Sequence, residues 1–319
     1  MRVVFLGTPG FALNSLRKLI ESKHEVIAVV CQPDKPNARG NKIVPCEVKC
    51  LAQQHNIPVY QFEKIGRDGV DTLKKLKPDI MITVAYGQIL TQQIIDIPKH
   101  GIINVHASLL PKYRGASPIQ TAIIKGETCS GITIMQTDIG LDTGDILAAE
   151  KVEIANDDTA ESLGRKLSAI GAELLLETLN NIEEGNVTRI KQVHSDATFT
   201  HKITKQDCII NWLKSSHQIK CLIMGANPEP IASTKLNDIV VKIYTASEVQ
   251  LELTKEYQPG EILPESSAKN GVFVKCGSGA LKLGLMQLPG GKVLEATQLF
   301  CGRKLKVGDI FEHSIQIEG

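Results

Sequence analysis

The 319-residue sequence predicts an α/β N-terminal domain with a mostly parallel sheet, followed by a small C-terminal β-barrel domain. This length is long for one domain and sufficient for two. In the first half, short apolar runs alternate with amphipathic stretches, which is typical of a parallel sheet covered by helices on both faces. In the second half, short β-like runs are separated by turn signals, which favours a small barrel.

The elements of the first half follow in a regular order. "RVVFLG" predicts a strand, and residues 11–22 predict a helix with Leu13, Leu16, Leu19 and Ile20 on one face. The strands "EVIAVV", "IPVYQ", "DIMITVA" and "GIINVH" come next, separated by helix-like stretches near 45–56, 67–77 and 88–96. "GITIMQT" and "GDILAAEKVEI" are close enough to pair as an antiparallel hairpin or extension, and a helix over about 158–184 closes this half. We therefore expect a Rossmann-like, mostly parallel sheet over residues 1–187.

The sequence changes character after residue 187. Residues 188–205 contain four basic residues and one acidic residue, a net charge of +3, and predict an exposed basic linker. From residue 206 to 319, one helix ("SSHQIKCLIMGA") precedes the β-like runs "DIVVKIYTASE", "GEILPE", "GVFVKCG" and "ALKLGLMQL". These residues contain twelve basic and twelve acidic side chains, so only an uneven distribution would create a basic surface there.

The bulk composition excludes few functions. Hydrophobic residues make up 42% and charged residues 22% of the chain, and the net charge is +1, an ordinary globular balance. No run approaches the roughly 18 apolar residues of a membrane span, and the first apolar run is too short for a secretory signal. Eight scattered cysteines form no C-x-x-C pair. We expect a cytoplasmic protein with reduced thiols and no metal site.

Two polar side chains end the strand "GIINVH". Asn104 and His106 are two positions apart, so they point to the same face. They stand at the carboxyl end of the strand, where ligands bind in open α/β sheets. A hydrogen-bonded pair that caps the strand is the alternative interpretation. Leu109 and Leu110 follow in the loop, either as the wall of an apolar ligand pocket or tucked into the core. Ser117 and Pro118 then predict the start of a helix.

The loop "TDIGLDTGD", residues 137–145, supplies a third polar group. It could be a plain glycine-rich turn, but Asp142 lies about one strand–helix–strand unit beyond His106, so the two could meet at one sheet edge. A carboxylate beside an imidazole favours the charged ring, and a charged His next to an amide can donate to an oxyanion. The carboxylate can also accept a proton from an attacking amine. Asn104, His106 and Asp142 thus suit acyl-type transfer to an amine.

The stretches "GIINVHASLLPKYRGASPIQ" and "GITIMQTDIGLDTGDIL" together closely resemble the folate-dependent formyltransferases. That resemblance implies transfer of a formyl group from the co-substrate 10-formyltetrahydrofolate to an amine, with Asn104, His106 and Asp142 as catalytic residues. It implies a folate site lined by Ser108, Leu109, Leu110, Pro111, Val84, Ala85, Tyr86, Gly87, Asp138 and Gly140. Ala107 stands where relatives often carry Gly or Pro, but it faces away from the catalytic pair.

The loop "CQPDKPNARGNKIVPCEVK", residues 31–49, carries a net charge of +2. Taken alone it is most simply a solvated loop. It resembles, however, the insertion loop of the methionyl-tRNA formyltransferases, which enters the acceptor stem of the tRNA. Lys35, Arg39 and Lys42 are then the implied tRNA-binding residues, although Ala38 replaces a glycine of that motif. "ITKQDCIINW" and "ANPEP" resemble the opening of the family's OB-like tRNA-binding domain, which implies that residues 206–319 are such a domain.

The resemblance implies formylation of the α-amino group of methionyl initiator tRNA, by a protein that we expect to be monomeric. A sugar-nucleotide formyltransferase is the nearest alternative, but it needs no basic insertion loop. A dinucleotide-binding protein is disfavoured because "GTPGFA", residues 7–12, lacks G-x-G-x-x-G. A protein that only binds nucleic acid would not need Asp142.

Overall fold

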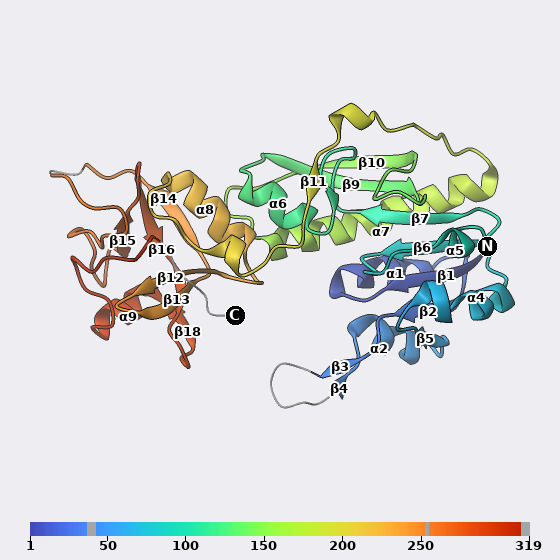
Figure 1. The fold of residues 1–319 in the computed structure, drawn as a ribbon, viewed down its shortest axis with the longest axis horizontal. Coiled ribbons are helices and arrows are strands. Elements are labelled where there is room, and N and C mark those ends of the chain that lie inside the picture. The colour runs from blue at the N-terminus through green and yellow to red at the C-terminus, as the bar shows by residue number, and fades with distance from the viewer. Residues whose placement is uncertain (37–42, 253–254, 314–319) are drawn as a thin grey trace. The chain divides into compact units, whose positions relative to one another are not determined.

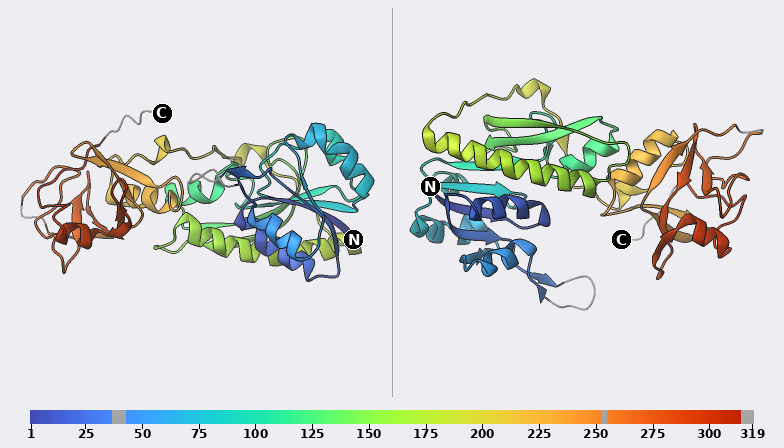
Figure 2. Two further views of the ribbon diagram at one scale, coloured as in Figure 1. Left: turned by 90° about the horizontal axis from the view of Figure 1, so that it is seen from below. Right: turned by 180° about the vertical axis from the view of Figure 1, so that it is seen from behind.

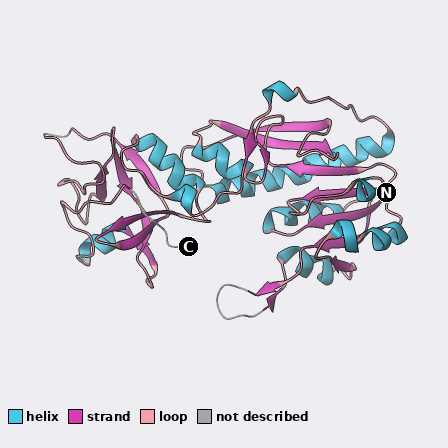
Figure 3. Ribbon diagram, viewed as in Figure 1, coloured by secondary structure: helices cyan, strands magenta, loops and turns pink. Residues whose placement is uncertain are grey.

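The computed structural model describes residues 1–36, 43–252 and 255–313. It divides into two compact units that interleave along the chain. Unit 1 comprises Met1–Ala116, Ser130–Glu153 and Gly164–Thr200, and unit 2 comprises Ser117–Cys129, Ile154–Leu163 and His201–Gly319. None of the helices among the described residues combines the length and the hydropathy that a membrane-spanning helix requires. Figure 3 distinguishes the helices and strands of both units.

Unit 1 is built on a seven-stranded sheet with the order β10-β9-β7-β6-β1-β2-β5 (Figure 1). Its strands are β1 (Arg2–Gly7), β2 (Glu25–Cys31), β5 (Val59–Gln61), β6 (Ile80–Val84), β7 (Ile102–His106), β9 (Cys129–Gln136) and β10 (Ile146–Glu153). The five strands from β7 to β5 are parallel, whereas β9 pairs antiparallel with β7. Hydrogen bonds at both ends of the β9–β10 pair make it antiparallel too. The predicted mostly parallel sheet and its antiparallel extension are confirmed.

Helices cover both faces of this sheet because its strands are apolar on both sides. They are α1 (Leu13–Ile20), α2 (Glu47–Gln54), α3 (Ile65–Asp68), α4 (Val70–Leu76), α5 (Gln92–Ile95) and α7 (Ala160–Glu184), whose first residues belong to unit 2. One core joins α3, α4 and α5 to alternate residues of β1 and β2 and to Met81 of β6. On the other face, α7 crosses beside β7 and β9 (Figure 2), where a Cβ on Gly171 would lie 3.1 Å from Val105.

Two predicted helices differ from the structure. The stretch 67–77 is divided at Gly69 into α3 and α4, and the stretch 88–96 contains only the four-residue α5. The chain before α5 is held in a loop, in which Gly87 has a φ of +83° and the Gln88 side chain binds the backbone of Ile65 and Phe62. These long-range bonds replace the helix that the local pattern indicated.

The expected exposure of the 188–205 segment does not hold throughout. Its β11 (Phe199–Thr200) pairs in parallel with β8 (Arg114–Gly115) in unit 1. Gln192 and Thr200 are buried. Ile190 bridges to Ile146 at the start of β10. Most side chains of residues 188–200 are exposed, as predicted, but two buried side chains and the two backbone pairings attach the segment to the rest of unit 1, which its net charge did not reveal.

Unit 2 is a small domain of mainly antiparallel strands. One sheet has the order β12-β13-β17-β18, and a second has the order β14-β16-β15. These strands are β12 (Ala232–Leu236), β13 (Ile239–Ile243), β14 (Ala246–Val249), β15 (Val272–Lys275), β16 (Ala280–Leu283), β17 (Leu285–Gln287) and β18 (Val293–Glu295). The chain passes from one sheet to the other at Thr245 and at Gly284, where a Cβ would meet the Thr245 hydroxyl at 2.3 Å. "GEILPE" forms isolated bridges rather than a strand of either sheet.

The core of unit 2 is centred on the one tryptophan of the sequence. Trp212 is fully buried, stacks on Phe311 with ring centroids 5.4 Å apart, and donates from Nε1 to the Thr234 hydroxyl at 3.0 Å. Helices α6 (Pro118–Ile124), α8 (Ser216–Gly225) and α9 (Ala296–Cys301) belong to this unit. Ser117 is the N-cap residue of α6, as predicted, but its hydroxyl accepts from the backbone N–H of Ile203.

Candidate active site

Asn104 and His106 lie on one face of β7, near its carboxyl end. Asn104 is half-buried and His106 is 6% exposed, so both are largely withdrawn from water. In the register of the sheet, Asn104 is opposite Thr83 of the parallel β6 and opposite Met135 of β9. The alternation of the strand therefore delivers an amide and an imidazole to the same side, as the sequence predicted.

The hydroxyl of Thr83 fixes the Asn104 amide. Thr83 donates to Oδ1 of Asn104 at 2.8 Å. With its oxygen occupied in this way, the amide presents its two N–H donors to the site. A preoriented donor of this kind stabilises negative charge that develops on a carbonyl oxygen.

His106 stands between two acceptors. Its Nε2 lies 3.0 Å from the backbone carbonyl oxygen of Tyr113, which can only accept, so Nε2 carries the proton and donates. On the other side of the ring, Nδ1 lies 3.7 Å from Oδ2 of Asp142. That separation is too long for a hydrogen bond but close enough for a charge interaction with a protonated ring. Nδ1 therefore makes no hydrogen bond to the Asp142 carboxylate and can bond to a substrate.

Asp142 is held by contacts to both its side chain and its backbone. Its φ of +52° is in the left-handed region that non-glycine residues rarely adopt. Oδ2 accepts from the backbone N–H of Gly115 at 2.7 Å, and the backbone oxygen accepts from Nε2 of Gln192 at 2.9 Å. Among the described residues, none makes a hydrogen bond to Oδ1, which remains available to accept a proton.

The loop of residues 137–145 reaches His106 by an indirect path. Because β9 is antiparallel to β7, the loop leaves β9 at Gln136, which is opposite Ile103 rather than His106. The backbone bond from Gln136 N–H to the Asp145 oxygen closes the loop at the same place. Asp142 thus meets His106 because the loop folds back along β7, and not because two parallel strands end at one edge.

The predicted folate-lining segment 84–87 follows β6 directly. Val84 is fully buried, and Ala85 and Gly87 both have left-handed φ values of +49° and +83°. Tyr86 is 3% exposed, and its hydroxyl has no hydrogen-bond partner among the described residues. Burial raises the pKa of the Tyr86 phenol, so the ring remains neutral. This segment brings a sharp turn and an unsatisfied hydroxyl to the end of β6.

The "SLLP" segment makes several hydrogen bonds with its own loop and with Thr133. Ser108 is buried, and its hydroxyl donates to the Lys112 carbonyl at 2.6 Å. The Thr133 hydroxyl donates to the Ser108 carbonyl and accepts from the Leu110 N–H. Leu110 is buried, Leu109 packs beside Gly131, and Pro111 is half-buried. The two leucines are largely tucked inward, which is the alternative that the sequence left open.

The 137–145 loop presents both a closed polar turn and exposed apolar side chains. Oδ1 of Asp138 accepts from the Gly140 N–H and from the Thr143 hydroxyl. Ile139 and Leu141 are 67% and 59% exposed. Ile89, in the loop after β6, is 88% exposed. These three side chains are the apolar surface that the two predicted folate-lining loops leave open to solvent.

The predicted tRNA-binding residues are placed only in part. Lys35 is exposed in β3 (Lys35–Pro36), which pairs with β4 (Ile43–Val44), whereas Arg39 and Lys42 lie outside the described residues. Lys49 pairs with Asp34, and Gln61 bonds to both side chains. This contact raises the pKa of Lys49 and lowers that of Asp34, and it neutralises one basic residue at the base of the loop.

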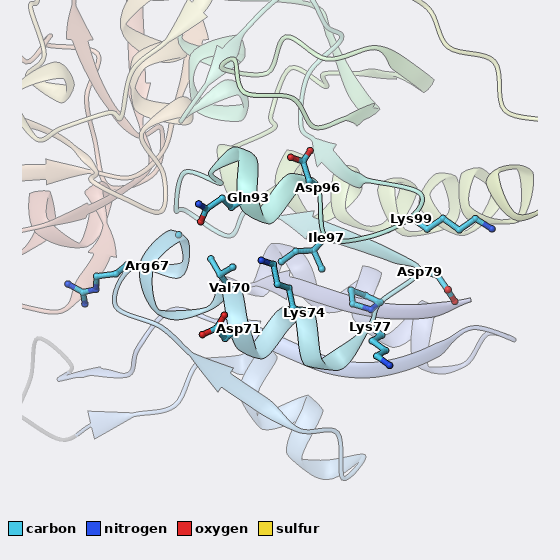
Figure 4. Close-up of a pocket in the computed structure, with 12 residues that line it drawn as sticks. Arg67, Val70, Asp71, Lys74, Lys77, Asp79, Gln93, Asp96, Ile97 and Lys99 are labelled. Atoms are coloured by element: carbon cyan, nitrogen blue, oxygen red, sulfur yellow. The ribbon is translucent and has the colours of Figure 1, made fainter.

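A hollow of about 950 Å³ lies on the surface of α3, α4 and α5 (Figure 4). It contains none of the predicted site residues. Its charged lining is mixed, with Arg67, Lys74, Lys77 and Lys99 against Asp71, Asp79 and Asp96. This balance does not select a ligand of either sign. Among the described residues, no group of three or more His, Cys, Asp or Glu side chains could hold a metal ion.

Five residues of the site neighbourhood were not identified from the sequence: Thr83, Tyr113, Arg114, Gly115 and Gln192. Tyr113 to Gly115 lie inside the quoted "KYRG" motif, so the motif located them without indicating their contacts. Gln192 gave no signal, because a glutamine in a basic, polar stretch has the composition of a linker.

Comparison with known proteins identifies the family. A model described as "Formyl transferase" matches residues 1–179, and one described as "Formyl transferase, C-terminal domain" matches residues 202–304. The chain is 44% identical over 309 residues to the methionyl-tRNA formyltransferase of Geobacter metallireducens, with 97% of each chain covered. It is 45% identical over 314 residues to that of Sulfurihydrogenibium sp., covering 98% of this chain and 100% of the relative.

Solved structures show the same fold at lower identity. The sugar 3N-formyltransferase WlaRD has a TM-score of 0.67 at 21% identity, covering 92% of this chain and 99% of the other. The methionyl-tRNA formyltransferase of Clostridium thermocellum has a TM-score of 0.55 at 17% identity, covering 77% and 93%. The chain belongs to the formyl transferase family, and within it to the methionyl-tRNA formyltransferases.

Proposed function

We propose that Asn104, His106 and Asp142 together transfer the formyl group of 10-formyltetrahydrofolate to the α-amino group of methionyl initiator tRNA. The contact between His106 and Asp142, beside Asn104, is the observation that carries the proposal. It brings an amide donor, an imidazole and a carboxylate into one largely buried group, and these are the groups that attack by an amine on a formyl carbon requires.

Asn104 and His106 stabilise the formyl oxygen as it gains negative charge. The Thr83 bond leaves the Asn104 amide N–H groups to donate. On His106, the Nε2–H donates to the backbone carbonyl oxygen of Tyr113, so the Nδ1 side is the one that faces the reaction. Protonated Nδ1 donates to the oxygen while Asp142 balances the charge of the ring.

Asp142 has two distinct tasks, one for each carboxylate oxygen. Oδ2 is anchored by Gly115 and faces His106, whereas Oδ1 has no described hydrogen-bond partner. The α-amino group attacks as the neutral base and becomes positively charged as its bond to the formyl carbon forms. Oδ1 accepts the excess proton directly or through one water molecule, and a proton returns to N10 of the folate as its bond to the formyl carbon breaks, which releases tetrahydrofolate.

The two loops around this group fit the folate. Ile89, Ile139 and Leu141 offer exposed apolar surface for a flat ring system, and burying them against a ligand would remove that surface from water. The Tyr86 hydroxyl, which is buried without a described partner, can hydrogen-bond to a polar edge of the ring system. We assign the segments 84–87, 108–111 and 138–140 to this site. When bound there, 10-formyltetrahydrofolate supplies the activated formyl group.

The tRNA is proposed to contact two regions. Lys35, Arg39 and Lys42 of the insertion loop provide charges for the phosphates of the acceptor stem. Residues 206–319 provide a second, OB-like surface, and residues 1–187 form the catalytic domain. Contacts to phosphate give affinity rather than base selection, so discrimination of the initiator depends on other contacts. We propose a monomeric, cytoplasmic enzyme.

A formyl-transfer assay with three acceptors tests the proposal. The purified protein is given 10-formyltetrahydrofolate with initiator methionyl-tRNA, with elongator methionyl-tRNA, or with an amino-sugar nucleotide. Transfer to the initiator tRNA, and not to the sugar nucleotide, is expected. Transfer to the amino-sugar nucleotide alone would assign the site to the sugar-modifying branch of the fold, which the WlaRD structure represents.

A further inference from the structure

We propose that Gln192 and Arg114 are positioning residues that hold the 137–145 loop so that Asp142 faces His106. This inference rests on the proposed role of Asp142 and adds two residues from outside the catalytic group. All the atoms involved belong to unit 1.

The Gln192 amide uses its full hydrogen-bonding capacity. Nε2 donates to the backbone oxygens of Asp142 and Gly144, at 2.9 Å and 2.7 Å. Oε1 accepts from Nη2 and Nε of Arg114, at 2.6 Å and 3.1 Å. The amide can take only this orientation, because backbone oxygens only accept and a guanidinium only donates. Gln192 is 7% exposed, so these bonds are shielded from competing water.

Arg114 fixes the orientation of the Gln192 amide by donating to its oxygen. It is 2% exposed, and no carboxylate is paired with it among the described residues. Its side-chain contacts are to Gln192 and to Nδ1 of His194, at 3.3 Å. A buried cation is costly unless its donors are satisfied. The guanidinium therefore strongly favours the Gln192 oxygen in this place, and the glutamine in turn directs its donors at the loop.

The loop needs such an anchor for two reasons. It leaves β9 opposite Ile103 and has to fold back to reach His106. Asp142 also adopts a left-handed φ of +52°, which a free loop would not keep. Gly115, adjacent to Arg114, donates to the Asp142 carboxylate. The strand β8 thus holds Asp142 twice, through its own backbone and through the Arg114–Gln192 contact.

Substitution of Gln192 tests the role directly. In Gln192→Ala, the Gly115 amide should exchange with solvent about 10-fold faster, since the carboxylate that it binds is no longer held in place. This readout needs no substrate, so it stands even if the proposed activity is wrong. The kcat for formyl transfer should fall about 10- to 100-fold, while KM for both substrates changes by less than about 2-fold. Unchanged exchange at Gly115 would overturn the proposal.

Two further variants separate positioning from packing. Gln192→Glu keeps acceptors for Arg114 but loses the two donors to the loop, so kcat should fall while the melting temperature stays near that of the wild type. Arg114→Lys keeps the charge but lacks the two-donor fork, and a smaller loss of kcat is expected. Gln93→Ala, on the exposed face of α5, is the matched control and should change neither readout. A Gln192→Glu enzyme with wild-type kcat would contradict a role for the donors.

A double-mutant cycle shows whether Gln192 acts through Asp142. In single-turnover measurements, Gln192→Ala should reduce the rate of the wild type but cause no further loss in Asp142→Ala. Multiplicative losses would show that Gln192 acts elsewhere and would overturn the proposal. Full activity of Asp142→Ala alone would instead refute the proposed function, so the two failures are distinguishable.

Discussion

Nδ1 of His106 lies 3.7 Å from Oδ2 of Asp142. His106 is the last residue of β7, whereas the loop that carries Asp142 leaves β9 opposite Ile103, near the start of β7. Three consecutive residues make this possible. The Tyr113 carbonyl accepts from His106, Arg114 binds the glutamine that holds Asp142, and the Gly115 N–H binds the Asp142 carboxylate. The segment 113–115, which follows β7, therefore orients both partners of the proposed catalytic pair.

Replacement of the imidazole should affect chemistry more than binding. In His106→Ala, kcat should fall by about 10²-fold or more, because a donor to the developing oxyanion is lost. Asp142 keeps its contacts to Gly115 and Gln192 in this variant, so the loop should remain in place. Steady-state kinetics and equilibrium binding of both substrates measure the two effects. Normal turnover would remove His106 from the mechanism.

Removal of the Thr83 hydroxyl should misorient the Asn104 amide. Thr83→Val has nearly the same shape but cannot donate to Oδ1 of Asn104. We expect kcat to fall about 10-fold, since a donor that is not held in place stabilises charge less well. Thr83→Ser keeps the hydroxyl and is the matched control. Equal rates for the valine and serine variants would show that the hydroxyl is dispensable.

Arg39 belongs to the insertion loop and lies outside the described residues. From the sequence resemblance, Arg39→Ala should weaken tRNA binding and reduce the slope of log K against log salt by about 1, because one phosphate contact is lost. Folate binding should not change. Binding titrations at several salt concentrations measure the slope, and an unchanged slope would make the loop an ordinary surface feature.

The ion pair at the base of that loop should make stability depend on pH. Bonds from Lys49 and Gln61 hold the pKa of Asp34 below its usual 3.8, and both charged side chains of the pair are 18% exposed. A lowered folded-state pKa stabilises the fold above the unfolded value, and that stability is lost as pH falls through the folded value. Asp34→Asn should therefore reduce the free energy of unfolding by up to about 1 kcal/mol at pH 7.

Chemical unfolding at pH 7 and pH 3 provides the measurement for Asp34. The difference between wild type and variant should shrink at the lower pH, where the wild-type carboxylate begins to lose its charge. A difference that is constant over this range would show that the pair does not contribute through its charge.

The sequence predicted those parts of the fold that depend on local patterns. Alternation in β7 placed Asn104 and His106 on one face, and the apolar runs located the parallel strands. Contacts that join distant segments left no such pattern. Gln192 is 50 residues from the backbone oxygen that it binds on Asp142, so its role depends on tertiary structure alone. The expected helix at 88–96 was largely replaced by Gln88 contacts for the same reason.

The structure brings Asn104, His106 and Asp142 together, as the sequence predicted, but Asp142 reaches the other two by a different route; their catalytic role stays a prediction. Asp142 was expected at a sheet edge shared with His106, whereas the antiparallel β9 ends beside Ile103, near the amino end of β7, and the loop folds back to His106. The "SLLP" leucines were given two possible environments, and the structure packs them largely inward because Thr133 bonds close the loop beneath them.

The single-turnover rate of formyl transfer by Asp142→Asn tests the central claim most directly. Asparagine has the size of aspartate and can still accept from the Gly115 N–H, but it can neither balance the charge of His106 nor take up the amine proton. With initiator methionyl-tRNA and 10-formyltetrahydrofolate, we predict a rate about 10²-fold or more below that of the wild type, with both substrates still bound. A rate equal to that of the wild type would contradict the proposed mechanism.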